Sequence, residues 1–338
     1  MTDYFRPLVQ IGPARPETAV PLAGGWGWFT HVEVLSRNAP AQVIPAGDMP
    51  ADKAARLTAP RAPIAGMSLD RPRIMGILNT TPDSFSDGGQ HADVADAVTA
   101  GLAMAQSGAD IIDIGGESTR PGASFVPIET EIKRTAPAIS ALRAAGLTLP
   151  ISIDTRKAAV AEAAVAAGAN LVNDVSGFTF DPGLAPFCQK HQLPVCVMHT
   201  QGDPATMHLN HSYSNVVLDV YDTLEDQISK LETGGIARNA SLADPGIGFG
   251  KNLEHNLALL ARISIFHMLG TALLLGVSRK SFISKIDRDC DAKDRIAGSI
   301  AAAIAGWDRG VQIFRVHDVA ETRQALAVWQ AIEAAEDV

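Results

Sequence analysis

Four short side chains with oxygen acceptors stand at or just after apolar runs of the sequence. They are Asp113 in "DIIDI", Asp154 in "SIDTRK", Asn173 in "VNDVSG" and Asp244 in "ADPGIGFGK". Acceptors that emerge from apolar strands indicate an enclosed site, because a buried carboxylate needs charge-assisted hydrogen-bond partners. The group therefore suits a ligand that offers several N–H donors in one plane.

Basic side chains form a second group. They are Arg120 in "GGESTRPGASF", Lys280 in "GVSRKSF" with Arg279 beside it, and Arg315 and His317 in "RVHD". Side chains of these types suit an anion. Together the two groups predict a ligand with a donor-rich flat ring at one end and a phosphate-like group at the other.

The stretch "RIMGILNTTPDSFSDGG", residues 73–89, joins an apolar run to a loop rich in hydroxyls and carboxylates. At the junction Asn79 offers a hard oxygen for Mg²⁺ held against a pyrophosphate, since Mg²⁺ keeps several waters and takes few protein ligands. We expect this loop, and the loop "GGESTRPGASF" with Gly115, Gly116 and Gly122, to act as mobile lids. The alternative is that both are ordinary surface connections.

These residues lie in an alternation of apolar runs and Ala-rich helical patterns that begins at residue 73. The apolar runs, which predict strands, span 73–78, 110–114, 150–153, 170–173, 194–198, 240–243, 272–276 and 311–315. The helical patterns span 91–107, 129–145, 156–167, 182–191, 213–233, 252–262, 290–308 and 318–335. Strict alternation requires parallel strands with crossover helices, and this many units favour an α/β fold of the (β/α)8 (TIM) barrel type over 73–338. The alternative is an open, doubly wound sheet.

The carboxyl ends of all strands meet at one rim of such a barrel, where active sites of this architecture lie. Every predicted strand is followed by a polar or chemically useful residue, with Met198 and His199 after the fifth. Any single one could be a helix cap or a turn residue, because Asp, Asn and Ser are favoured there for structural reasons. Their presence after every strand indicates that the rim is a site.

The first 72 residues have a different character. They hold ten of the 20 prolines and show no convincing helical period. The segments 4–12 and 26–37 predict short strands, and 38–72 predicts a loop or linker rich in Ala and Pro. We expect a small appendage packed on the barrel; a partner-binding module is the alternative.

Composition limits the class of protein. A net charge of −9 argues against non-specific nucleic-acid binding, and no segment has the length and apolarity of a membrane span or the pattern of a secretion signal. Three cysteines suggest no disulfide framework. We therefore expect a cytoplasmic protein that acts on small molecules, without nucleic-acid or membrane partners.

A set of motifs then matches a known family. "MGILNTTPDSFSDGG", "GADIIDIGGESTRPGA", "ISIDTRK", "LVNDVSG", "VMHTQGDPATM", "DPGIGFGK", "GVSRKSFI" and "RVHDV" closely resemble, in order and at suitable spacing, the motifs of dihydropteroate synthases. The resemblance covers about residues 73–335. It implies an enzyme of folate synthesis that condenses dihydropterin pyrophosphate with p-aminobenzoate, releases pyrophosphate, uses Mg²⁺ and forms a homodimer.

The resemblance also implies roles for individual residues. For the pterin ring they are Asp154, Asn173, Met198, Asp244 and Lys280. For the pyrophosphate they are Thr119, Arg315 and His317, with Asn79 on Mg²⁺. For p-aminobenzoate they are Arg120, Pro121, Phe249 and Ser281.

We expect breakage of the C–O bond to pyrophosphate to limit the reaction, since the aniline nitrogen keeps its lone pair at neutral pH. Arg315, His317 and Mg²⁺ would stabilise the leaving group, and Asp113 and Asp154 the pterin cation. Lys280 completes the expected catalytic group. The chain departs from the family at Thr200, often Met, and in 208–213, which lacks a common proline; we expect both to alter loop packing more than chemistry.

Three alternatives remain at this point. The spacing Cys188-x-x-His191 and Cys196-x-x-His199 superficially suggests zinc, but residues three apart on a strand point to opposite faces. A pterin-binding barrel for methyl transfer would share the ring acceptors without needing the anion-binding motifs. A homologue without synthase activity, kept as a scaffold, should show eroded rim residues.

Overall fold

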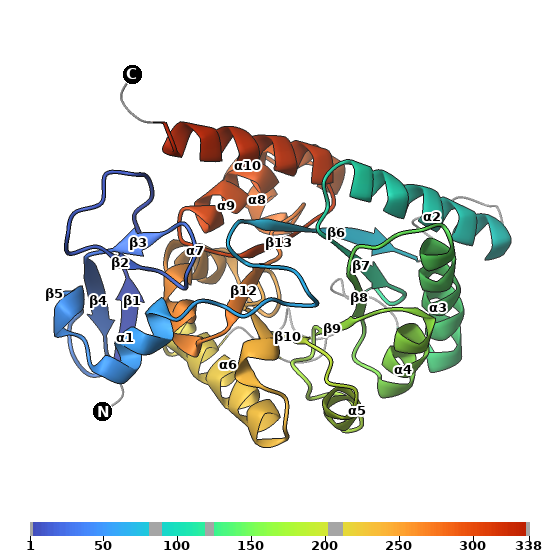
Figure 1. Cartoon of the computed structure of the whole chain (residues 1–338), viewed down its shortest axis with the longest axis horizontal. Helices are drawn as coiled ribbons and strands as arrows, with labels where there is room; N and C mark the ends of the chain where they lie inside the picture. The colour runs from blue at the N-terminus through green and yellow to red at the C-terminus, as the bar shows by residue number, and fades with distance from the viewer. Residues whose placement is uncertain (1–2, 81–89, 119–124, 202–211, 336–338) are drawn as a thin grey trace.

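A closed barrel of parallel strands forms the body of the protein (Figure 1). The structure, a computed structural model, describes residues 3–80, 90–118, 125–201 and 212–335. The barrel strands are β6 (Arg73–Asn79), β7 (Ile111–Gly115), β8 (Ile151–Asp154), β9 (Leu171–Asp174), β10 (Val195–Met198), β11 (Ser241–Asp244), β12 (Ala272–Leu275) and β13 (Ile313–Val316). Each strand pairs with its sequence neighbours, and β13 closes the ring against β6. The predicted (β/α)8 class is confirmed.

The strands present apolar residues to the barrel interior at its base and polar residues at its mouth. Ile111, Leu171, Leu242 and Ile313 belong to one buried cluster inside the base. Since side chains on a strand alternate between faces, the residues two positions later point to the same interior. Those residues are Asp113, Asn173, Asp244 and Arg315.

Helices surround the barrel and cover its outer face (Figure 1). They are α2 (Gln90–Gln106), α3 (Ile128–Ala144), α4 (Ala158–Ala167), α5 (Leu184–Lys190), α6 (Val216–Thr233), α7 (Leu253–Ala261), α8 (Ser281–Ile286), α9 (Ile296–Trp307) and α10 (Val319–Glu333). Short 3₁₀ helices span Arg238–Ala240, Ile263–Leu269 and Ala292–Asp294. No helix among the described residues is long and apolar enough to cross a membrane.

The predicted helix 290–308 is wrong at its start. α9 begins at Ile296, and the preceding residues form a 3₁₀ turn after the separate helix α8, which the sequence did not predict. The stretch "DRDCDAKD" (287–294) explains the break, because it offers no apolar period to pack against the barrel.

The first 72 residues form an ordered appendage. An antiparallel sheet holds β1 (Tyr4–Pro7), β4 (His31–Leu35) and β5 (Gln42–Pro45), and a smaller one pairs β2 (Val20–Pro21) with β3 (Trp28–Phe29). The predicted loop 38–72 is wrong in part, because it contains β5, a 3₁₀ turn at Ala46–Asp48 and the helix α1 (Ala51–Thr58). α1 escaped prediction since it has only two turns and one buried side chain, Leu57.

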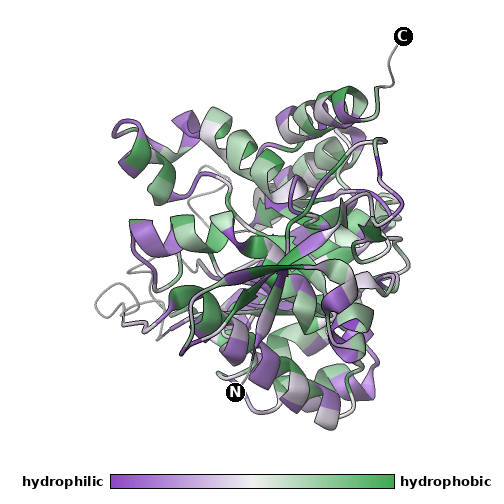
Figure 2. Cartoon of the chain, turned by 90° about the vertical axis from the view of Figure 1, so that its left-hand side faces the viewer, coloured by the Kyte–Doolittle hydropathy of each residue, from purple (hydrophilic) through white to green (hydrophobic). Residues whose placement is uncertain are grey.

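This N-terminal extension, residues 1–72, packs on the barrel through buried aromatic and polar contacts. The Trp26 ring stacks on Trp307 with centroids 5.8 Å apart, and Ser264 Oγ donates to the carbonyl of Pro7. Figure 2 looks onto the extension and shows its strands in front of the barrel. The end of the extension, with Ile64, Met67 and Leu69, joins the cluster inside the barrel and closes its base.

Candidate active site

Arg315 joins three strands across the mouth of the barrel. Its Nε donates to Asp113 Oδ2 at 2.6 Å, and its Nη2 donates to Asp154 Oδ2 at 2.7 Å. Asn173 Nδ2 also donates to Asp113 Oδ2, at 3.3 Å. Within the described residues the other oxygen of Asp113 is buried and accepts no hydrogen bond, so it remains available to a ligand donor.

Burial sets the charges of this group. It raises the pKa of Asp154 to about 7; Arg315 opposes that shift and the charge of Asp113 adds to it. Burial alone would lower the pKa of Arg315, but Asp113 and Asp154 hold it above its ordinary value. The mouth therefore holds a permanent cation next to a carboxyl group that changes charge near neutral pH.

Lys280 and Asp244 are two further charged residues of the mouth, and each acts on the pKa of the other. The ammonium of Lys280 donates to the carbonyl of Ile247 and lies 4.2 Å from the centre of the Phe249 ring. Burial lowers the pKa of Lys280 to about 8, and Asp244 opposes the shift. Burial likewise raises the pKa of Asp244, whose Oδ1 accepts a hydrogen bond from Gly246 N–H at 2.7 Å.

A left-handed backbone conformation directs Lys280 into the mouth. Arg279 has φ +58°, which is unfavourable for a residue with a side chain. Its N–H donates to Ser299 Oγ at 2.8 Å, its carbonyl accepts from Arg295, and its guanidinium pairs with Asp318 at 3.0 Å. These contacts from α9 and from the N-cap residues of α9 and α10 hold the turn, and no local pattern predicted them.

His317 is fixed by the neighbouring loop. Its Nδ1 shares a hydrogen bond with Ser278 Oγ at 2.9 Å, and its backbone N–H donates to the same oxygen at 3.1 Å. The loop after β12, which carries Lys280, is thus tied to the end of β13, which carries Arg315. This is the place where barrels commonly bind phosphate groups.

The loops after β10 and β11 are tied by a buried lysine that sequence analysis did not single out. Lys251 Nζ shares a hydrogen bond with His199 Nδ1 at 2.9 Å and donates to the carbonyls of Gly246 and Phe249, both at 2.9 Å. Gly246 has φ +67°, and a Cβ there would overlap the carbonyl oxygen of His199. Glycine is therefore required where these loops meet.

A buried ion cluster beside the mouth was also missed. Lys157 Nζ lies 2.6 Å from Glu131 and 3.2 Å from Glu117, and it donates to the carbonyl of Val126 at 2.7 Å. Glu117 accepts the N–H of Val126 and pairs with Arg156 at 3.1 Å. The cluster holds together the two described ends of the loop after β7.

The comparisons with known proteins agree with this geometry. A family model described as "Pterin binding enzyme" matches residues 75–317. The dihydropteroate synthase of Escherichia coli K12 is 44% identical over 274 residues, which cover 80% of this chain and 96% of that protein. The synthase of Neisseria meningitidis serogroup B is 42% identical over 271 residues, 79% of this chain and 94% of the relative.

The chain belongs to the dihydropteroate synthase family. A solved dihydropteroate synthase of Xanthomonas albilineans with 4-aminobenzoic acid superimposes with a TM-score of 0.77 at 46% identity, covering 82% of this chain and 99% of that one. The same enzyme in complex with 7,8-dihydropteroate superimposes with a TM-score of 0.74 at 43% identity, covering 82% of this chain and 100% of that one. These matches support the synthase interpretation over the methyl-transfer one.

Most of the residues that the family resemblance named gather at the mouth. Met198 ends β10 with its side chain buried, and Asn79 ends β6, half-buried, in register with Gly115. Ser281 is exposed at the start of α8. Residues Thr119, Arg120 and Pro121, most of the two expected lids (81–89 and 119–124) and most of the unusual segment 208–213 lie outside the described residues.

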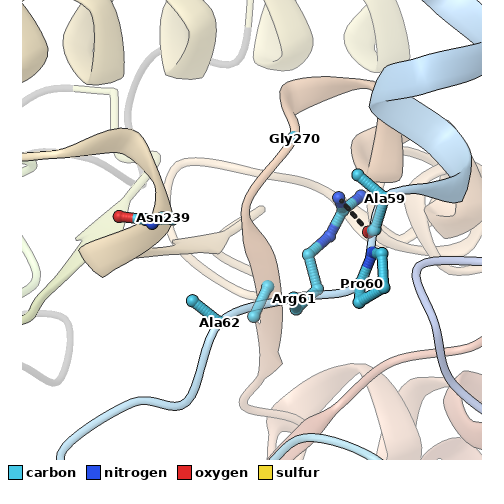
Figure 3. A pocket seen from close by; sticks show the side chains of 7 residues that line it. Ala59, Pro60, Arg61, Ala62, Asn239 and Gly270 are labelled. Atoms are coloured by element: carbon cyan, nitrogen blue, oxygen red, sulfur yellow. Dashed lines mark hydrogen bonds between the residues drawn. The ribbon is translucent and has the colours of Figure 1, made fainter.

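Within the described part of the chain, no three His, Cys, Asp or Glu side chains stand together as a metal site, at the two cysteine–histidine pairs or elsewhere. Cys196 points into the apolar base of the barrel, and burial raises the pKa of the Cys188 thiol to about 12. A separate hollow of about 150 Å³ lies at the base, and Arg61, Asn239 and Gly270 are among the residues that line it (Figure 3). It stands at the amino ends of the strands, away from the mouth.

Proposed function

We propose that the barrel mouth is where this chain, as a dihydropteroate synthase, joins 6-hydroxymethyl-7,8-dihydropterin pyrophosphate to p-aminobenzoate. The products are 7,8-dihydropteroate and pyrophosphate. The observation that carries the assignment is the contact of Arg315 with both Asp113 and Asp154 in a buried mouth. It brings a cation for a leaving phosphate within reach of carboxylates for the ring.

The pterin ring is recognised by acceptors from separate strands. Asp154, Asn173 and Asp244 come from β8, β9 and β11 and face the same interior. They accept the ring N–H groups. Within the described residues one oxygen of Asp113 is buried and has no hydrogen-bond partner, which supports a ligand rich in donors. Lys280 donates to a ring acceptor, and Met198 packs against the ring face.

The pyrophosphate lies toward the ends of β13 and β12, on Arg315 and His317, with Thr119 from the loop after β7, the second loop of the mouth. The donor set at the mouth fits a magnesium ion, because Mg²⁺ binds hard oxygens and commonly takes one or two protein ligands together with substrate phosphates. Asn79 would hold it. When bound, the ion neutralises charge on the leaving group.

The reaction breaks the C–O bond between the pterin methylene and the pyrophosphate, and the bonding electrons leave with the oxygen. Arg315 and His317 stabilise the negative charge that develops there, while Asp113 and Asp154 stabilise the pterin cation. The aniline nitrogen then bonds to the methylene carbon and loses a proton. No strong base is needed, since the protonated aryl amine is itself a strong acid.

p-Aminobenzoate binds at the outer part of the mouth. Phe249 lies under the ammonium of Lys280 and offers an aromatic face, and Ser281 is exposed at the start of α8. Arg120 and Pro121 of the second loop complete the pocket. A carboxylate on the ligand suits the hydroxyl and N–H donors at this helix start.

We also propose that the chain forms a homodimer in the cytoplasm. α9 carries no charged residue, and its outer face exposes Ala297 and Ala301 beside half-buried Ile300 and Ile304. An apolar helix face of this kind favours contact with a second copy. The three cysteines are unpaired, which suits a reducing compartment.

The test is release of pyrophosphate by the purified chain, given dihydropterin pyrophosphate and Mg²⁺, with and without p-aminobenzoate. Release that depends on the aniline, with dihydropteroate as product, is expected. Tight binding of the pterin without release would contradict the proposed function.

A further inference from the structure

The N-terminal extension lies outside the family match, which begins at residue 75. Its contacts with the barrel nevertheless include a helix that leads directly from the mouth. That helix is α6 (Figure 1), which follows the loop after β10, called the fifth loop from here on. Through these contacts the extension can affect the position of α6.

One side of α6 is acidic and faces the extension. Asp219 and Asp222 both pair with Arg37, each at 2.7 Å, through the two terminal nitrogens of its guanidinium. The hydroxyl of Tyr4 donates to Asp222 at 2.9 Å. One turn further along, Glu225 pairs with Arg56 of α1 at 3.1 Å. Three acidic residues at helical spacing thus contact three side chains of the extension.

Asp219 has a second function at the start of the helix. While its Oδ1 contacts Arg37, its Oδ2 accepts the N–H groups of Ser214 and Asn215 at 2.9 and 3.1 Å. Asn215 in turn caps α6 by accepting from Val217 N–H. The same carboxylate therefore connects the extension to the described end of the fifth loop.

From this end the contacts continue into the active site. Tyr213 OH donates to the carbonyl of Gly250 at 2.9 Å, and its ring packs edge-on against His255. Gly250 directly follows Phe249, whose ring lies 4.2 Å from the ammonium of Lys280. Described contacts thus run without a gap from Arg37 to the proposed pterin site.

We propose that Arg37 is a positioning residue for the synthase site. By holding Asp219 and Asp222 it fixes the first two turns of α6, and with them Tyr213 and the loop after β11 that carries Phe249. The extension is on this view a part of the catalytic apparatus of this chain rather than a passive attachment. The effect of Arg37 on catalysis rests on the proposed function, whereas its effect on the order of α6 and Tyr213 does not.

The experiment compares three variants of the full-length chain. Arg37→Met removes both ion pairs, and Arg37→Lys keeps the charge. Arg6→Met is the matched control, because Arg6 pairs with Glu33 inside the same sheet and that pair does not include the barrel. Two quantities are measured for each: amide hydrogen exchange over residues 212–219, and KM and kcat with dihydropterin pyrophosphate.

We expect Arg37→Met to accelerate exchange over 212–219 and to raise KM for the pterin substrate by about 2- to 10-fold, the range that two partly exposed ion pairs support. kcat should change less than KM. Arg37→Lys should recover part of both effects, and Arg6→Met should leave both at the level of the unchanged chain.

Equal losses of thermal stability in Arg37→Met and Arg6→Met, without a change of exchange or KM, would overturn the proposal and leave the extension a stabilising brace. A second variant, Tyr213→Phe, removes the contact with Gly250 and should reproduce the KM effect. If no form releases pyrophosphate, the proposed function fails, whereas the exchange data still decide whether Arg37 fixes this segment.

Discussion

Asp113 and Arg315, which are 202 residues apart in the chain, are joined across the barrel mouth by a hydrogen bond of 2.6 Å between Oδ2 and Nε. A second bond to Asp154 prevents the guanidinium from turning. The cation is thus oriented before any anion arrives. Preorganisation of this kind is what makes electrostatic stabilisation of a leaving group effective.

Replacing Arg315 should therefore affect turnover more than binding. For Arg315→Met we expect kcat to fall about 100-fold or more, the cost of removing one preorganised donor. The kcat of Arg315→Lys should lie between those of Arg315→Met and the unchanged chain, since an ammonium keeps the charge but cannot bond both carboxylates in the same way. Pyrophosphate release measures this. An unchanged kcat with weakened binding of pterin pyrophosphate would show that the leaving-group role is wrong.

The pH dependence of activity should have two limbs. Below about pH 7 Asp154 is protonated, and above about pH 8 Lys280 loses its charge. We expect kcat/KM for the pterin substrate to rise through the first value and fall through the second. In Lys280→Arg the side chain stays charged, so the fall of kcat/KM above about pH 8 should disappear from the activity that this variant retains. A limb still present near pH 8 in that variant would assign it to another group.

Stability should respond to Asp154 in the opposite sense to activity. The pKa of Asp154 is raised to about 7 by burial, so the folded chain binds more protons than the unfolded chain between about pH 4 and pH 7. The contribution of Asp154 to stability is present at low pH and is lost as the pH rises through 7. The Tm of Asp154→Asn relative to the unchanged chain should therefore increase from pH 5 to pH 8. Parallel Tm curves would contradict this.

Gly246 should not tolerate a side chain. Its φ is +67°, and a Cβ would overlap the carbonyl of His199, so Gly246→Ala must displace the loop that carries Phe249. We expect lower thermal stability and weaker pterin binding, measured by calorimetry. Gly47→Ala is the matched control, because nothing lies within 4 Å of its added Cβ. Similar effects of both substitutions would contradict the steric argument.

Lys157 should be essential for stability. Lys157→Met leaves Glu131 fully buried without its cation, and removing one partner of a buried pair commonly costs about 3–5 kcal/mol. Lys230→Met, which breaks an exposed pair with Asp226 on α6, should cost no more than about 0.5 kcal/mol. The difference in the free energy of unfolding is measured by denaturant titration. A small effect of Lys157→Met would show that Glu131 becomes protonated and tolerates the loss.

The sequence predicted the barrel and the acceptors at its mouth, because both depend on local patterns. Asp113 and Asp244 stand at the carboxyl ends of apolar runs, and in a parallel barrel the carboxyl ends of the strands meet at the mouth. α1 was not predictable in the same way, since its only buried residue, Leu57, gives no period.

Contacts between distant segments were also beyond the sequence. Arg37 and Asp219 are 182 residues apart, and nothing in either local pattern indicates that they meet. A lysine is usually exposed, so the sequence predicts Lys157 at the surface, whereas it is almost completely buried against Glu131. Only the folded arrangement reveals the residues that hold the proposed site in place.

The closure of the barrel base by Ile64, Met67 and Leu69 has a consequence for the order of events. Side chains of the strands and of the extension together fill the barrel below its mouth. In the proposed reaction both substrates enter, and both products leave, through this one mouth. The order in which they arrive and depart is therefore part of the control of turnover.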